Sequence, residues 1–245
     1  MRLPADWIVP DWPAPAGVKA FVTTRNGGVS TGPYTSLNLG TLVGDDPEAV
    51  ARNRERVQAA LPSEPRWLRQ VHGIVVVDAG EVDGQTTADA AFTRRRGIAC
   101  VVQIADCMPV LVCDASGSTV AIAHAGWRGL AAGIVERTVE AMDRPAADLI
   151  AWLGPAIGPT AFEVGEDVVR AFTADDPGSA SAFSALREGK WLADLFALAR
   201  RRLSRLGVRA VFGDVVCTHS DARRFFSHRR DGVTGRQAAF IWRES

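Results

Sequence analysis

The stretch from residue 98 to residue 123 constrains the fold of this chain more than any other. It reads IACVVQIADCMPVLVCDASGSTVAIA and divides at two short turns into three apolar segments, which predict strands over 98–104, 109–113 and 119–123. Their apolar residues are consecutive rather than alternate, so each strand is expected to be buried on both faces of its sheet. Such a sheet needs a covering layer on either side, and the 245-residue chain, 47% hydrophobic, is large enough to supply it.

Helices and further strands surround this stretch. Asp45 or Asp46 followed by Pro47 is typical of a helix start, and that helix is expected to reach about Leu61. Two more helices are predicted over 129–142 and 191–206. Additional strands are predicted over 18–24, 67–71, 74–78, 149–153, 208–217 and 238–242. No proline- or glycine-rich linker interrupts the series, so we expect one α/β domain over residues 1–245, with mixed sheets flanked by helices and an extended lead-in at 1–17.

Charge and composition exclude several classes of partner. The 28 Lys and Arg residues balance 28 Asp and Glu residues, without a basic block, so a nucleic-acid partner is not expected. No apolar run approaches 18 residues, which argues against a membrane partner. Four prolines and two aspartates interrupt the first 15 residues, so they do not form a signal peptide, and the four cysteines are too sparse for a disulfide scaffold. We therefore expect a cytoplasmic protein with reduced thiols.

Three residues that can bind a metal share one context. His72 in QVHG, Cys107 in IADC and His124 in IAHAG each lie at or just past the end of a predicted buried strand, where ligand sites gather in α/β folds. Two imidazoles and a thiolate suit zinc or copper, and three ligands leave a fourth position open for water or substrate. A second interpretation stays open at this point, in which Cys107 is a nucleophile that one histidine deprotonates.

Seven motifs, which span almost the whole chain, resemble the YfiH-like family, also called the multicopper polyphenol oxidase or laccase-domain family. They are TTRNGGVSTGPYTSLNLG (23–40), QVHG (70–73), ADAAFT (88–93), ADCMPV (105–110), AHAGWRG (123–129), GPAIGPTAFEVG (154–165) and FFSHRRDGVTGR (225–236). The resemblance implies a layered α/β/β/α fold, similar to that of a cytotoxic necrotizing factor domain. It also implies that His72, Cys107 and His124 bind a metal, which is zinc, with copper as the alternative.

The resemblance implies activity on purine nucleosides. Family members are described as catalysing phosphorolysis of adenosine, inosine, guanosine and methylthioadenosine with phosphate, and deamination of adenosine. Three alternatives stay open: a peptidoglycan editing hydrolase that removes a misincorporated amino acid from a cell-wall precursor, a copper-dependent polyphenol oxidase, and a metal-binding module without activity. An oxidase with several copper centres needs many more histidines, and beyond the proposed ligands only His219 and His228 remain.

Further residues receive expected roles from this chemistry. A metal held by three ligands lowers the pKa of a bound water towards ~7, and deamination then needs a proton shuttle. Asp106 and Glu163 are the candidates, and Asp106 is equally well interpreted as an acceptor that orients a ligand histidine. For phosphorolysis we expect anion binding by Arg25 and its glycine-rich loop, by Arg128 near a helix start and by Arg229. Asn38 is expected to bind a nucleoside hydroxyl.

Overall fold

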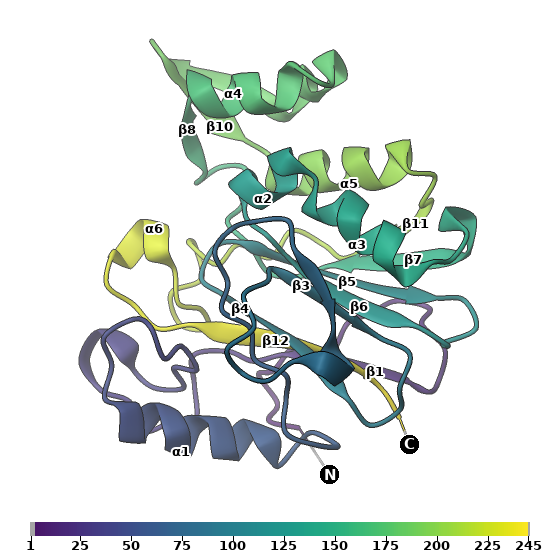
Figure 1. Ribbon diagram of the computed structural model, residues 1–245. Coiled ribbons are helices and arrows are strands. Elements are labelled where there is room, and N and C mark those ends of the chain that lie inside the picture. The colour runs from purple at the N-terminus through teal and green to yellow at the C-terminus, as the bar shows by residue number, and fades with distance from the viewer. Residues whose placement is uncertain (1–2, 245) are drawn as a thin grey trace.

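Two stacked β-sheets form the centre of the computed structural model, which describes residues 3–244 (Figure 1). The larger sheet mixes parallel and antiparallel strands in the order β11-β7-β5-β6-β3-β2. Its strands are β2 (Val76–Asp78), β3 (Ala90–Thr93), β5 (Met108–Asp114), β6 (Val120–Ala125), β7 (Leu149–Leu153) and β11 (Ala210–Phe212). The smaller sheet is antiparallel, in the order β1-β12-β4, and its strands are β1 (Val18–Val22), β4 (Ala99–Ile104) and β12 (Gln237–Arg243).

Helices cover the outer face of each sheet. α3 (Ile134–Met142) and α5 (Leu195–Arg205) pack on the larger sheet, whereas α1 (Pro47–Gln58) packs on the smaller one, as Figure 1 shows. 3-10 turns at Gly32–Tyr34, Ala79–Glu81, Ala146–Asp148 and Pro177–Ala182 complete the connections. The layered α/β/β/α fold predicted above is confirmed.

Alternate residues of the central strands enter different cores, which explains why those strands are apolar throughout. On β5, Val110 and Val112 lie in the core shared with α3 and α5. Leu111 and Cys113 point to the opposite face, into the core between the two sheets. The expectation that these strands are buried on both faces is therefore correct.

A small third sheet extends beyond the layers and was not predicted. It consists of β8 (Glu163–Gly165), β10 (Lys190–Ala193) and β9 (Phe183–Arg187), with α4 (Glu166–Thr173) beside it (Figure 1). Asp176, in the connection that follows α4, accepts hydrogen bonds from the guanidinium of Arg201 on α5. These bonds hold the pKa of Asp176 far below its usual value.

Several predicted boundaries were wrong. Residues 67–71 do not form a strand: Arg69 makes an isolated bridge with Thr87, and the preceding Arg66 makes another with Cys100. The predicted helix over 129–142 is divided at Gly133, whose φ of 102° breaks it into α2 (Trp127–Ala132) and α3. The helix expected from 191 begins at Leu195, because 190–193 pair as β10, and the strand expected over 208–217 is limited to β11.

The lead-in is extended over its described residues, 3–17, apart from turns. Trp7 stacks on Phe21 at 4.8 Å, and Ile8 bridges Val22, which fixes the lead-in against β1. Across 3–244 no helix has both the length and the apolar composition required to cross a membrane.

Candidate active site

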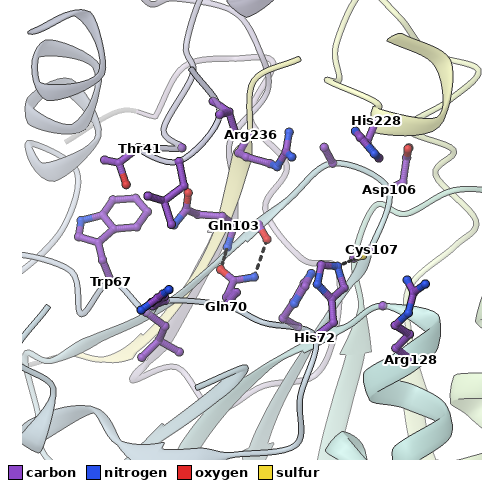
Figure 2. A pocket seen from close by; sticks show the side chains of 18 of the residues that line it. Thr41, Trp67, Gln70, His72, Gln103, Asp106, Cys107, Arg128, His228 and Arg236 are labelled. Carbon is purple, nitrogen blue, oxygen red and sulfur yellow. Dashed lines mark hydrogen bonds between the residues drawn. The ribbon is translucent and has the colours of Figure 1, made fainter. Parts of the chain in front are cut away.

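Three sequence-distant side chains meet as a possible metal centre. One ligand atom from each of His72, Cys107 and His124 lies within 4.8 Å of the other two. The Cys107 Sγ atom is 3.7 Å from His72 Nε2, and the two imidazole rings are 4.8 Å apart between centroids (Figure 2). A zinc ion with tetrahedral angles and ordinary bond lengths separates its sulfur and nitrogen ligands by roughly 3.6 Å. The donor set and its spacing therefore fit zinc.

Each ligand is placed by a different part of the fold. His124 is buried and is the last but one residue of β6, so it lies at the end of a buried strand as expected. Cys107 occupies the turn between β4 and β5, and His72 lies in the loop before β2 with a positive φ of 61°. Gly126 closes the site from one side, because a Cβ atom there would lie 2.6 Å from Cys107 Sγ and 3.1 Å from His72 Cδ2.

Asp89, which sequence reasoning missed, joins two of the ligands. Its fully buried carboxylate accepts a hydrogen bond from His124 Nδ1 at 2.9 Å, which leaves His124 Nε2 to bind a metal. The same carboxylate accepts the backbone N–H groups of Val71, His72 and Gly73 at 3.1, 2.9 and 2.7 Å. Burial opposes the charge on Asp89, but the bonds from His124 and the backbone hold its pKa below its usual value.

The electrostatics of the cluster favour a thiolate. Burial alone would raise the pKa of Cys107, but the two neighbouring histidines, His124 first, lower it to about 6. Conversely, although burial disfavours its charged form, the pKa of His124 is raised by Cys107 and Asp89. The thiolate is the form of cysteine that binds metals, whereas His124 has to release its extra proton when a metal binds.

The cluster lines a cavity of about 840 Å³ whose wall also contains five arginines: Arg54, Arg69, Arg128, Arg229 and Arg236. Across residues 3–244 none of these five arginines forms an ion pair with a carboxylate. Arg128 lies over the ring of Trp127, and Arg236 donates to the backbone carbonyls of Thr234 and Gly235. Because protein carboxylates leave these guanidinium groups unneutralised, the cavity can hold an anion.

Asp106 lines the cavity, but its carboxylate is occupied by other groups. It accepts the hydroxyls of Thr218 and Ser227 at 2.6 and 2.9 Å and the backbone N–H of Arg229 at 2.7 Å. These bonds hold the start of α6 (His228–Asp231) at the cavity wall. The interpretation of Asp106 as the acceptor that orients a ligand histidine was wrong, because Asp89 does this.

Three other predicted residues do not line the cavity. Glu163 pairs with Arg187 at 2.7 Å on the third sheet. Arg25 donates to the carbonyls of Thr35 and Ala222. The buried Asn38 uses its whole amide within the chain, donating to Gly40 and Asp45 and accepting the N–H groups of Gly40 and Arg236. Asn38 thus supports Arg236 from behind the cavity.

One family profile matches almost the whole chain. The profile of the family described as multi-copper polyphenol oxidoreductase laccase matches residues 19–244. The chain belongs to this YfiH-like family. Its relatives include the E. coli purine nucleoside phosphorylase YfiH, 52% identical over 96% of this chain and 98% of that protein. A purine nucleoside phosphorylase of Pseudomonas aeruginosa is also 52% identical, with the same coverage of both chains.

The fold of this YfiH-like protein is shared with a solved structure. A crystal structure of a Neisseria meningitidis protein superposes with a TM-score of 0.95 at 53% identity, covering 98% of this chain and 100% of the other. The α/β/β/α layers are therefore features of a fold that has been determined by experiment.

Proposed function

We propose that this chain is a zinc-dependent purine nucleoside phosphorylase that cleaves adenosine, inosine, guanosine and methylthioadenosine, and that it also deaminates adenosine. One observation carries the proposal: a His₂Cys cluster and five arginines without carboxylate partners line the same cavity. The names of relatives that are about half identical over nearly their full length support the choice of purine nucleosides.

The residues that would hold zinc are His72, Cys107 and His124, with Asp89 fixing the orientation of His124. Bound zinc supplies a Lewis acid at this end of the cavity. We assign Cys107 the role of a ligand rather than a nucleophile, because its sulfur meets two histidines, which completes a three-donor set, whereas a nucleophile needs only one histidine as its base.

Phosphorolysis needs an anion held beside the sugar. A phosphate oxygen forms the bond to ribose C1′ while the bond from C1′ to the purine nitrogen breaks. The electron pair leaves with the base, which takes up one proton, and the products are ribose 1-phosphate and the free purine. We assign phosphate binding to Arg128, Arg229 and Arg236, and we assign to Asp106 the positioning of Arg229 through its backbone N–H.

The test offers the purified protein inosine with and without phosphate, and separately adenosine and a UDP-linked muropeptide. We expect hypoxanthine and ribose 1-phosphate from inosine in a phosphate-dependent reaction, and inosine from adenosine. Cys107→Ala should abolish turnover. Cys217→Ala is the matched control, because Cys217 is also a half-buried thiol but lies outside the cavity.

Other results would replace the proposal. A rate of base release that does not depend on phosphate would indicate a hydrolase. Release of an amino acid from the muropeptide without nucleoside turnover would indicate the editing function. Oxidation of a phenol would need several coppers, whereas residues 3–244 contain a single cluster of three donors.

A further inference from the structure

Gln103 is fixed in the cavity wall by the side chain of Gln70. Gln103 lies near the end of β4, at the edge of the smaller sheet. Its backbone N–H donates to Gln70 Oε1 at 2.7 Å, and its carbonyl accepts from Gln70 Nε2 at 2.9 Å (Figure 2). The Gln70 amide thus takes the place of a neighbouring strand, so the main chain of Gln103 is held from both sides.

The side chain of Gln103 is left available to a ligand. Val102 and Ile104 point into the core between the sheets, so the alternation of the strand turns Gln103 to the other face, where it lines the cavity. Within the described chain, 3–244, no hydrogen bond joins its carboxamide to another group, although Gln103 is half-buried. A carboxamide has two donor hydrogens and an acceptor oxygen, and here all of them remain for whatever enters the cavity.

A flat aromatic side chain lines the same cavity. The guanidinium of Arg54 lies 3.8 Å from the centre of the Trp67 ring, and it is anchored by two hydrogen bonds to the carbonyl of Leu39. Phe240 packs edge-on against Trp67 at 5.9 Å. These contacts fix the indole as a rigid part of the cavity wall.

The short stretch of chain between Gln103 and Cys107 limits how far Gln103 lies from the metal cluster. Gln103 precedes Cys107 by four residues, so their Cα atoms are at most about 14 Å apart. In the view of Figure 2, Gln70 and Gln103 lie between Trp67 and the His72–Cys107 pair. Resting on the proposed function, the geometry points to Gln103 as the residue that reads the C6–N1 edge of the purine base during phosphorolysis, with the ribose directed towards Cys107.

The chemistry of the carboxamide explains how one site accepts both 6-amino and 6-oxo purines. Adenine offers a donor at N6 and an acceptor at N1, whereas hypoxanthine and guanine offer an acceptor at O6 and a donor at N1. A glutamine amide matches the first pattern in one orientation and the second after a half-turn about its last side-chain bond. Because Gln70 holds the main chain, this turn needs no other change in the wall.

The experiment compares Gln103→Glu, Gln103→Leu and wild-type enzyme on adenosine, inosine and guanosine, by kcat/KM. A carboxylate only accepts, so it opposes adenine N1 but matches the two donors of guanine at N1 and N2. We expect Gln103→Glu to raise the guanosine-to-adenosine ratio of kcat/KM by about 10-fold or more. Gln103→Leu should lower all three values by similar factors, mainly through KM.

Gln85→Glu is the matched control, because Gln85 lines the exposed rim and receives the same added charge. Its ratio should stay within about twofold of wild type. Inhibition by free adenine and free guanine should show the same change of ratio without turnover. A ratio for Gln103→Glu that equals that of Gln85→Glu in both assays would overturn the assignment while the phosphorylase function stands. Absence of nucleoside turnover by the wild-type enzyme would overturn the proposed function, and the assignment with it.

Discussion

Replacing Asp89 by asparagine tests how the metal centre is held together. The carboxylate accepts four hydrogen bonds, two at each oxygen: His124 Nδ1 and the His72 N–H at Oδ1, and the Val71 and Gly73 N–H groups at Oδ2. Asparagine keeps one of these oxygens and replaces the other by an NH₂ group. In either orientation the new NH₂ group faces two donors, so two of the four bonds are lost.

The magnitude follows from the number of lost bonds. A hydrogen bond to a charged group contributes about 1.5–3 kcal/mol to stability, so losing two should lower the free energy of unfolding by about 3–6 kcal/mol. Because the orientation of a ligand histidine depends on its carboxylate partner, zinc affinity should fall by about 10- to 100-fold.

The assay combines urea unfolding with zinc competition against a chromophoric chelator. Asp114→Asn is the matched control: Asp114 is also buried and accepts bonds from Ser116, Ser118 and Thr119, but it lies at the opposite end of β5 from the metal centre. That variant should lose stability and keep its zinc affinity. An Asp89→Asn protein with wild-type zinc affinity would refute the reasoning, whatever its stability.

Three further predictions follow from other contacts. Gly126→Ala should weaken zinc binding, measured by chelator competition, by about 10-fold or more, because the new Cβ meets Cys107 Sγ. Gly17→Ala is the control: its new Cβ meets nothing within 4 Å, so the zinc affinity should not change. Asp176→Asn should lower the free energy of unfolding, measured in urea at pH 7. Because the pKa of Asp176 is depressed in the folded protein, the difference from wild type should be complete above pH ~4 and should shrink as the pH falls below that value. A difference that stays constant with pH would contradict the ion pair. Arg236→Gln should raise KM for phosphate by about 10-fold or more while changing KM for inosine far less, as steady-state kinetics would show.

The layers of the fold could be predicted because their signal is local. The consecutive apolar residues of 98–123 require burial on two faces, and the structure supplies a helical layer on one side and a second sheet on the other. The prediction of a strand over 67–71 was wrong because a local pattern does not show which group makes the hydrogen bonds. The apolar residues of this segment resemble a strand, but the side chain of Gln70, and not its main chain, pairs with β4.

Roles that depend on distant partners could not be predicted. Asp89 resembles an ordinary polar residue before a strand, and only the folded chain brings Val71, His72 and Gly73 to it. Arg25 was expected to bind anions because it precedes glycines, but the N–H groups of that loop are used internally, such as Gly28 with the Ser36 hydroxyl. Composition cannot distinguish a loop that binds a ligand from one that binds itself.

The most direct test of the account is the metal content of the purified protein, measured together with phosphate-dependent cleavage of inosine, for the wild type and His124→Ala. We predict about one zinc per chain and release of hypoxanthine with ribose 1-phosphate for the wild type, and loss of both in the variant. A wild-type protein that binds no zinc yet cleaves inosine, or a variant that keeps full activity without zinc, would contradict the central claim.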